Sequence, residues 1–243
     1  SNKIKFIKNK VVLVSGGGGS IGSELCRKIT LLEPKLLIIL ENNEPSLYSI
    51  NNELLQMSAF TKFKFILGSV GNISLVEKII LENKVDIIFH AAAYKHVPLV
   101  QSNPIEGIKN NVIYTRLLCD LAIKLRVKNM ILISTDKAVR PTNIMGASKR
   151  LAEIILQSFA KKEGSKDSKE FKTIFSMVRF GNVIGSSGSV LPLFQKQIQN
   201  GGPITLTSPN IIRYFMTIPE AVNLVLEASF LAKGGELFLL DMG

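Results

Sequence analysis

Short apolar runs rich in β-branched residues alternate with amphipathic segments along most of this chain. The short runs predict strands, and apolar residues that recur every three or four positions predict helices. Strands are expected at residues 10–14, 36–40, 64–67, 86–89, 129–134 and 173–179. Helices are expected at residues 20–32, 45–57, 73–83, 103–126 and 145–162. Strands that are apolar almost throughout and alternate with helices indicate an α/β fold, with a parallel sheet covered on both faces.

The pattern changes after Phe180, where residues 181–188 are rich in glycine and serine. A helix at 190–199, a short strand at 204–206, a helix at 219–231 and an edge strand at 236–240 are expected to follow. The chain has 243 residues, which suits one α/β domain with a small appended lobe. We therefore expect one domain over residues 1–180 and an incomplete C-terminal lobe over 181–243, interleaved with the last strands.

A glycine-rich loop, Gly16-x-x-Gly19-x-x-Gly22, follows the first predicted strand and opens the first predicted helix. Such glycines let the backbone turn tightly and approach a pyrophosphate, while the helix N-terminus directs its N–H groups at the phosphates. Ser20 and Ile21 begin that helix and are expected to lie against the cofactor. A merely flexible turn is the alternative, but the strand–loop–helix context favours a Rossmann-type, doubly wound domain that binds a dinucleotide.

Further cofactor contacts are expected at the ends of the second and fourth strands. Glu41 stands 19 residues after the last glycine of the loop. A carboxylate there accepts ribose hydroxyls and repels a 2′-phosphate, which favours NAD over NADP, although a solvated strand-end charge is the alternative. Ala91, Ala92 and Ala93 either let the chain lie along the cofactor or simply pack against a helix. Asn111 either orients backbone and water beneath the site or is an ordinary polar helix residue.

The chain carries a formal net charge of +11. Nucleic acid, an anionic lipid surface and a polyanionic small substrate each attract such a protein. No nucleic-acid motif is present and much of the excess is scattered lysine, so a solvated basic surface is the preferred interpretation and no nucleic-acid partner is expected. No apolar run approaches the 18 or more residues of a membrane span. Cys26 and Cys119 lie in predicted helices and fit buried packing in a reducing compartment.

The second half of the chain carries five short motifs that together resemble one protein family. The motifs are Ser134-Thr135-Asp136-Lys137-Ala138, Arg140-Pro141-Thr142-Asn143, Gly146-Ala147-Ser148-Lys149-Arg150, Arg179-Phe180-Gly181-Asn182-Val183 and Arg213-Tyr214-Phe215-Met216-Thr217. They resemble the extended short-chain dehydrogenase/reductases and, within them, the UDP-N-acetylglucosamine 4,6-dehydratases of the large type used in polysaccharide and glycan biosynthesis.

This resemblance implies a dehydration in which NAD takes a hydride from sugar C4 and returns it to C6. By resemblance Asp136 is the acid that protonates the leaving C6 hydroxyl, and Lys137 is the base that removes the C5 proton. Desolvation and the cationic Lys149 favour the neutral form of Lys137. Lys149 is expected to hold the nicotinamide ribose. An ordinary surface ion pair and a solvated helix lysine are the alternatives.

Met145 departs from the pattern of most short-chain dehydrogenases, which place tyrosine four residues before the lysine. A thioether cannot accept the proton of the sugar hydroxyl as a phenolate does. Either the chain is inactive as an oxidoreductase, or another group takes that proton. The large dehydratases resembled here share methionine at this place, which favours a substitute: Asp136, or a water held by Thr135 and Lys149.

The resemblance also implies the remaining contacts. Ser69, Val70 and Ser134 are expected to contact the cofactor, although Ser69 stands where aspartate often recognises adenine. Substrate contacts with a UDP-sugar are expected from Lys95, His96, Asn182, Ser189, Val190, Arg213 and Met216. Gln101 stands where glutamate is expected, which weakens the assignment of the sugar site. No metal site is expected.

The resemblance further implies a homo-oligomer that pairs through residues 103–126 and 145–162. It also implies that the full-length protein is anchored in the membrane, with this domain in the cytoplasm at the inner face. Two other functions stay open beside the dehydratase. One is a related enzyme, a nucleotide-sugar 4-epimerase or a dehydratase that inverts C5. The other is a catalytically silent cofactor-binding scaffold, for which Met145 is the main support.

Overall fold

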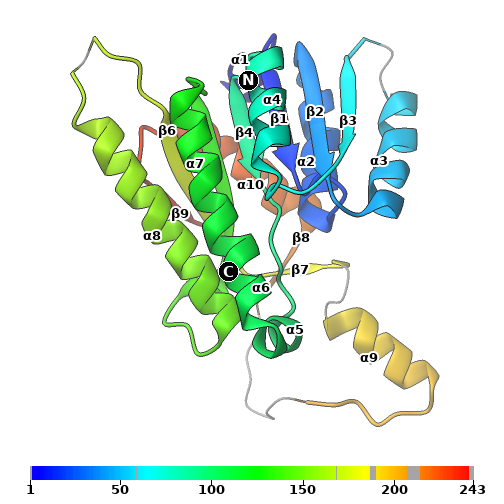
Figure 1. Ribbon diagram of the computed structural model, residues 1–243. Helices are drawn as coiled ribbons and strands as arrows, with labels where there is room; N and C mark the ends of the chain where they lie inside the picture. Colours follow the sequence, from blue (N-terminus) through cyan, green and yellow to red (C-terminus); the bar gives the residue numbers. More distant parts are fainter. Residues whose placement is uncertain (1, 58–59, 168, 187–189, 207–213, 241–243) are drawn as a thin grey trace.

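The computed structural model describes residues 2–57, 60–167, 169–186, 190–206 and 214–240. Within them, seven parallel strands form the central sheet in the order β3-β2-β1-β4-β5-β6-β9 (Figure 1). The chain runs outward from β1 in both directions, which confirms the doubly wound fold. The strands are β1 (Val11–Ser15), β2 (Leu36–Glu41), β3 (Phe63–Leu67), β4 (Ile87–His90), β5 (Asn129–Thr135), β6 (Ile174–Phe180) and β9 (Leu237–Leu239).

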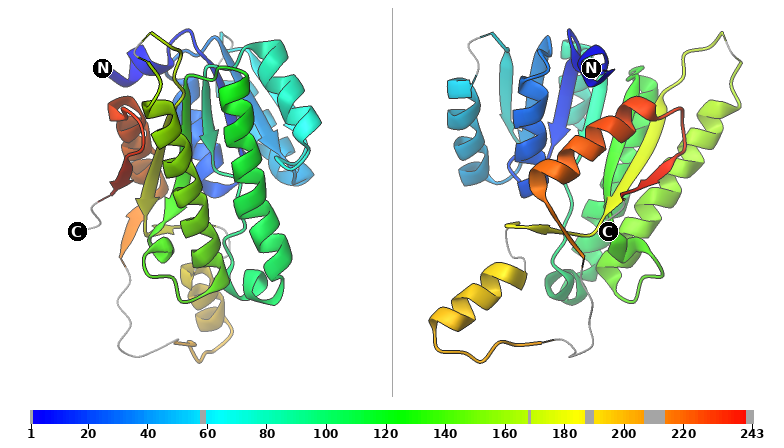
Figure 2. Two further views of the ribbon diagram at one scale, coloured as in Figure 1. Left: turned by 60° about the vertical axis from the view of Figure 1, so that its left-hand side comes forward. Right: turned by 180° about the vertical axis from the view of Figure 1, so that it is seen from behind.

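Helices cover both faces of the sheet (Figure 2). One face carries α1 (Asn2–Ile7), α2 (Ser20–Thr30), α3 (Glu44–Met57) and α10 (Ile218–Leu231), and the other carries α4 (Ile73–Asn83), α7 (Tyr114–Lys124) and α8 (Ile144–Gly164). Successive side chains of a strand enter opposite cores. In β1, Val12 and Val14 join the core on the α2 side, whereas Val11 and Leu13 join the core on the α8 side. Because both faces are buried, the strands lack polar alternation.

The helix expected at residues 103–126 is found over residues 104–124, but a π-helical turn interrupts its α-helical hydrogen bonding. After α5 (Val97–Ser102), the chain forms α6 (Pro104–Ile108), one π-helical turn, η1 (Lys109–Ile113), and then α7. Within that turn, the amide oxygen of Asn111 accepts the backbone N–H of Tyr94 at 2.8 Å. A wide turn of this kind is often found at functional sites. Here it holds the Asn111 side chain against the loop that follows β4.

The prediction of a strand at residues 204–206 is wrong. Gly201 and Gly202 have φ angles of +86° and +78°. The backbone N–H of Thr205 then donates to Oε1 of Gln197 at 3.2 Å, so the segment bonds to helix α9 (Val190–Gln199) instead of to a strand. The edge strand expected at 236–240 is confirmed as β9, which pairs with β6.

A separate two-stranded ladder joins β7 (Asn182–Ile184) to β8 (Phe215–Thr217). The sequence did not predict it, because three residues are too few to show an alternation. The ladder lies across the carboxyl edge of the main sheet, with α9 beyond it (Figure 1). The domain boundary at residue 180 stays a prediction, since α10 packs on α2 and β9 extends the main sheet.

Candidate active site

The glycine loop lies at the carboxyl end of β1 and needs glycine for two separate reasons. Gly16 has a φ of +70°, and a Cβ there would lie 2.7 Å from Cα of Ala92. A Cβ on Gly22 would lie 2.0 Å from the carbonyl oxygen of Gly16. The first glycine therefore allows the loop to touch the chain after β4, and the second lets α2 begin against the loop. The α2 N-terminus at Ser20 and Ile21 consequently lies at the carboxyl edge of the sheet.

A cavity of about 220 Å³ lies beside this loop. It is lined by the expected cofactor residues Gly16, Gly19, Glu41, Ser69, Val70, Ala91, Ala92 and Ala93, together with Leu40, Asn42, Gly68, Tyr94 and Asn110. The structure thus brings together residues from five separate stretches of the chain. A cleft of glycines and small side chains with one carboxylate at its rim fits part of a dinucleotide.

Backbone hydrogen bonds fix the carboxylate of Glu41 at the rim of this cavity. Its Oε2 accepts the N–H of Gly18 at 2.9 Å, and its Oε1 accepts the N–H groups of Asn42 and Asn43 at 2.9 and 3.0 Å. A carboxylate has about four acceptor sites. Three backbone donors therefore orient Glu41 and still leave it able to accept a ribose hydroxyl.

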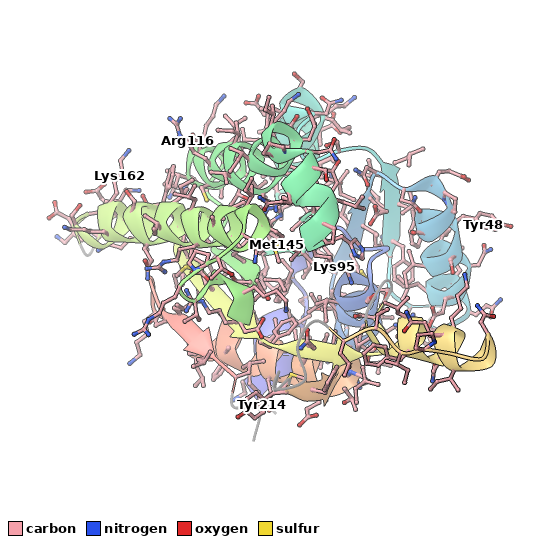
Figure 3. The ribbon with its side chains drawn as sticks, turned by 90° about the horizontal axis from the view of Figure 1, so that it is seen from below. Tyr48, Lys95, Arg116, Met145, Lys162 and Tyr214 are labelled. Atoms are coloured by element: carbon pink, nitrogen blue, oxygen red, sulfur yellow. The ribbon has the colours of Figure 1, made fainter. Side chains whose placement is uncertain are left out.

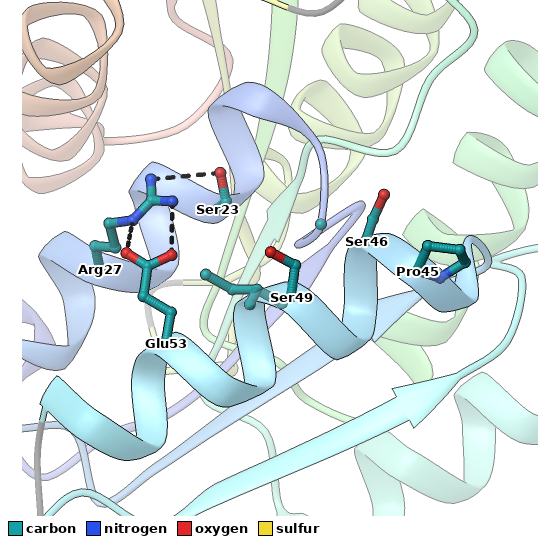
Figure 4. Close-up of a pocket in the computed structure, with 8 residues that line it drawn as sticks. Ser23, Arg27, Pro45, Ser46, Ser49 and Glu53 are labelled. Carbon is teal, nitrogen blue, oxygen red and sulfur yellow. Dashed lines mark hydrogen bonds and ion pairs between the residues drawn. The ribbon is translucent and has the colours of Figure 1, made fainter.

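A second cavity, of about 310 Å³, lies between α2 and α3 on the outer side of the glycine loop (Figure 4). Serine hydroxyls line it, from Ser23, Ser46 and Ser49. Nε and Nη2 of Arg27 donate to the two oxygens of Glu53 at 2.5 and 2.9 Å, so the guanidinium in this cavity is already paired. Although this cavity is larger, it contains none of the expected chemical residues, and the cleft at the sheet edge is the candidate site.

The expected acid and base lie side by side where β5 ends. Residues Asp136–Ala138 form a single 3₁₀ turn, capped by Thr135, whose hydroxyl oxygen accepts the N–H of Lys137 at 3.4 Å. The ammonium of Lys137 donates to Oδ1 of Asp136 and to Oδ1 of Asn182, both at 3.2 Å. The side chains of Asp136 and Lys137 are 48% and 33% exposed, so a substrate can reach both.

Lys149 is buried one helical turn into α8, and its ammonium donates to the carbonyl oxygen of Ile133 at 2.6 Å. Burial lowers the pKa of Lys149 from 10.5 to about 8, while the charge of Glu153 opposes that shift. A lysine with this pKa holds and releases a proton near neutral pH. The group is therefore placed to supply positive potential beneath the site.

A buried carboxylate joins the three elements that carry these side chains. Glu153 lies one turn after Lys149 on α8 and has no exposed surface. Its oxygens accept from Ser134 of β5 at 2.6 Å, from Arg179 of β6 at 2.5 and 2.7 Å, and from Arg150 at 3.0 Å. Burial alone would raise the pKa of Glu153, but these hydrogen bonds together lower it. The hydroxyl of Ser134 faces this network, so a cofactor contact at that position is left to its backbone.

Met145 lies where tyrosine is usual, and its side chain is only 2% exposed. Met145 lies in the first turn of α8, whose N-cap residue Asn143 accepts the N–H of Gly146 through its side-chain oxygen at 2.8 Å. Met145 and Lys95 both lie at the carboxyl edge (Figure 3). Since a thioether cannot carry a proton, the titratable side chains placed at this edge include Asp136, Lys137 and Lys149 instead.

The loop after β4 is clamped onto α8 through Asn111. The Asn111 amide donates to the carbonyl of Tyr94 at 2.9 Å and to Oγ of Ser148 at 3.0 Å. Lys95 comes next on that loop, and burial together with the positive charge of Lys137 lowers its pKa. Two cations therefore converge at the site, as binding an anionic substrate requires. His96 caps the following α5 as its N-cap residue without a side-chain hydrogen bond.

His90 is a residue of this region that sequence reasoning missed. It is fully buried at the end of β4, between Oγ of Ser15 at 2.7 Å and Oγ1 of Thr115 at 2.9 Å. The Thr115 hydroxyl donates to the carbonyl of Asn111, so it accepts from the Nε2–H of His90, and Nδ1 accepts from Ser15. Burial and the charge of Lys149 lower the pKa of His90 to about 3. A neutral histidine thus links β1, β4 and α7, and only its place before the alanine run could have drawn attention to it.

The structure brings Asn182 to Lys137 but does not test every expected substrate contact. Met216 is buried in β8 beside Val183, so it supports the ladder across the site. Ser189, Arg213 and the side chain of Val190 lie outside the described residues. Among the residues that are described, no cluster of three His, Cys, Asp or Glu side chains could hold a metal ion.

Comparison with known proteins decides the family. The polysaccharide biosynthesis protein family matches residues 12–243. The chain belongs to this family. Capsular polysaccharide biosynthesis protein CapD of Staphylococcus aureus is 48% identical over 98% of the chain. The protein is therefore an extended short-chain dehydrogenase/reductase of the polysaccharide biosynthesis type.

Two further similarities bear on the fold and the activity. The X-ray structure of Pen from Bacillus thuringiensis superposes with a TM-score of 0.88 at 36% identity, covering 98% of this chain and 70% of that one. A UDP-glucose 4-epimerase of Rickettsia canadensis is 34% identical over 95% of this chain and 66% of its own length. The chain spans only 39% of the length of the Staphylococcus relative.

Proposed function

We propose that this chain is the catalytic part of a nucleotide-sugar 4,6-dehydratase, which converts UDP-N-acetylglucosamine into a UDP-4-keto-6-deoxy sugar for polysaccharide or glycan biosynthesis. The observation that carries the proposal is the contact between Asp136 and Lys137 at the open edge of the sheet. Elimination of water needs an acid and a base within reach of adjacent carbons. A 4-epimerase moves a hydride and the C4 proton but eliminates no water, so it needs one acid–base group and not this pair.

The proposed cofactor is NAD. The cavity beside the glycine loop fits part of it, because glycines and alanines line the cavity and let a pyrophosphate approach the backbone. The carboxylate of Glu41 favours ribose hydroxyls and repels a 2′-phosphate. NAD, when bound, supplies oxidation at C4 of the sugar and reduction at C6. Lys149 then holds the nicotinamide ribose from below, anchored by the carbonyl of Ile133.

The acid–base steps follow from the side chains at the site. With Met145 unable to act, the carboxylate of Asp136 takes the proton of the C4 hydroxyl. It later gives that proton to the departing C6 hydroxyl. Lys137, held by Asp136 and Asn182, takes the C5 proton as a neutral amine and returns a proton to C5 when hydride reaches C6. A substrate that closes over the pair excludes water, so that bulk solvent does not compete for the protons held by the two groups.

The substrate we propose is anionic and reaches the site between Lys95 and Lys137. The positive charge of Lys137 lowers the pKa of Lys95, so the two ammonium groups repel each other and an anion between them relieves that repulsion. Further contacts with a UDP-sugar are proposed for His96, Asn182 and Met216. Self-association through α7 and α8 and anchoring of a longer protein at the membrane remain proposals.

A single incubation tests this function. UDP-N-acetylglucosamine is mixed with the protein and NAD in D₂O, and the products are followed by NMR. A 4-keto-6-deoxy sugar with deuterium at C5 is expected, and its coupling constants report whether C5 is retained or inverted. The absence of any turnover by both this chain and a longer version that includes its flanks would favour the silent scaffold.

The epimerase is the second candidate, because a 4-epimerase is similar over most of this chain. It predicts a galacto-configured product without a ketone and without deuterium at C5. The contact between Asp136 and Lys137 argues against it, since an epimerase needs one group that takes and returns the C4 proton and no second acid–base group. The same spectrum therefore separates the two enzymes.

A further inference from the structure

The amino edge of the sheet, opposite the candidate active site, carries a row of lysines. Every one of the seven strands of the sheet is preceded by a lysine within four residues. The row consists of Lys62, Lys35, Lys10, Lys84, Lys128, Lys172 and Lys233, in the order of the strands across the sheet. Neighbouring strands lie about 4.8 Å apart, so the row spans roughly 30 Å.

Backbone hydrogen bonds show that these positions are spatial neighbours. The N–H of Lys35 donates to the carbonyl of Lys10 at 2.8 Å, and the carbonyl of Lys62 accepts from Leu37 at 2.9 Å. The carbonyl of Lys128 accepts from Ile174, at the start of β6, at 2.8 Å. Because the strands are parallel, one residue type at each strand start makes one continuous edge.

Most of these charges have no counter-charge on the protein. Within the described part of the chain, Lys10, Lys35, Lys62, Lys84, Lys128 and Lys233 form no ion pair, whereas the ammonium of Lys172 donates to carbonyls of the loop after α8.

Several acidic residues at this edge are already engaged. Asp86 accepts the N–H of Val11 at 2.8 Å, Glu33 pairs with Lys8, and Glu236 accepts the N–H groups of Lys233 and Gly234. These carboxylates keep their charge, but the seven lysines of the row and Lys8 outnumber them, so the edge carries a net positive charge.

We propose that this edge, which we name the lysine edge, docks on an anionic phospholipid membrane. A row of lysine ammonium groups spread across a sheet edge suits a broad layer of phosphate headgroups. Duplex nucleic acid is read by a helix or ribbon that enters a groove, and single strands by stacked aromatics. The lysine edge is a row of strand starts, which suits a layer of headgroups better than either of these modes. The ring of Phe60, 98% exposed two residues before Lys62, adds an apolar group at one end of the edge.

The carboxyl edge would then face away from the membrane. The α1 helix lies with the lysine edge, and the candidate site and α9 lie at the opposite end of the molecule (Figure 1). A substrate could therefore enter from the aqueous side while the domain rests on lipid. This inference does not depend on the proposed reaction, because it uses none of the residues at the site.

Sedimentation with vesicles tests the inference. The protein is mixed at low salt with vesicles of phosphatidylglycerol and phosphatidylcholine in equal parts, or of phosphatidylcholine alone. Binding is expected only to the anionic vesicles, and it should disappear at 1 M salt, where the screening length is only about 3 Å. No binding to anionic vesicles at low salt would overturn the inference.

A pair of triple variants assigns the surface. Each lysine near an anionic bilayer contributes roughly fivefold to partitioning, so K35Q, K62Q and K128Q combined should weaken it on the order of 100-fold. The matched control combines K78Q, K109Q and K196Q, three exposed lysines away from the edge, and should change partitioning several-fold at most. Equal losses in both triples would mean that only net charge matters. Tighter binding to a duplex DNA oligomer, with the same dependence on the first triple, would replace the membrane by nucleic acid.

Discussion

The two edges of the central sheet carry charge in opposite ways. At the carboxyl edge, charged groups are held: Glu41 by three backbone N–H groups, Lys149 by a carbonyl, and Lys137 by Asp136 and Asn182. At the lysine edge most of the cations are exposed and form no ion pair with the described residues. Oriented charges suit chemistry, because a proton or hydride needs a fixed geometry. Unpaired, repeated charges suit a diffuse anionic surface, where no single contact has to be exact.

The topology explains why the two edges can differ. In a parallel sheet the loops that follow the strands diverge around a crevice, and ligands bind there. The loops that precede the strands have no such crevice, so their residues are free of the demands of a pocket. A change at one edge should therefore leave the activity of the other edge intact.

The largest effect is expected from D136N at the carboxyl edge. The amide cannot take the C4 proton or return it to the leaving group, so dehydration should fall about 10²–10⁴-fold. Formation of enzyme-bound NADH, read by absorbance, should be lost with it. A variant that still reduces bound NAD normally contradicts the dual role of Asp136. D120N, on the exposed face of α7, is the matched control and should retain activity, and membrane binding should be unchanged in both.

The next effect concerns the buried network beneath the site. E153Q leaves Arg179 facing a neutral amide in a buried position, and losing one partner of such a pair costs about 3–5 kcal/mol in the free energy of unfolding. The exposed pair of Lys124 and Glu77 provides the control, because E77Q should cost no more than about 1 kcal/mol. Urea denaturation measures both. Similar values for the two variants would mean that Glu153 does not hold β5, β6 and α8 together.

Much of the carboxyl edge could be predicted from the sequence, because spacing carries the information. The glycine loop, Glu41 and the alanine run each follow a strand, so the parallel sheet brings them together as expected. The role of Glu153 could not be predicted, since its three partners come from residues up to 26 positions away. The sequence also did not predict the π-helical turn at Asn111, because the apolar periodicity of the helix continues through it.

The lysine edge offers the opposite lesson. The lysines were interpreted as scattered charge, yet one precedes each strand of the sheet, and all seven of those strands were predicted. The pattern was present in the sequence, but it becomes visible only when charge is mapped onto strand starts. His90, at the carboxyl edge, shows a limit of prediction from sequence. Nothing in its sequence context distinguishes a buried, neutral histidine from one that binds a ligand.

A smaller effect should appear in the pH dependence of stability. Lys149 has a pKa of about 8 when folded and 10.5 when unfolded, so between these values the unfolded chain binds more protons. Stability should therefore rise as pH increases from about 8 towards 10.5, by at most about 1.4 kcal/mol per pH unit. K149M should abolish this contribution, which is read as the difference between the two urea-denaturation curves at each pH. K128M, at the lysine edge, is the control, because an exposed lysine gives no such slope.

The smallest effect is expected from Glu41 at the rim of the cofactor cavity. E41Q sharpens the comparison of the two edges because it removes one charge of the carboxyl edge and keeps a side chain of nearly the same shape. E41Q keeps an oxygen that accepts backbone N–H groups but removes the charge that repels a 2′-phosphate. Binding of NAD should weaken several-fold and binding of NADP should strengthen, so the preference for NAD falls about tenfold, equivalent to roughly 1.4 kcal/mol. Fluorescence titration with both reduced cofactors measures the ratio. E44Q, three residues further along at the start of α3, is exposed and should leave the ratio unchanged. An unchanged ratio in E41Q would mean that the backbone around the rim, and not its charge, selects the cofactor.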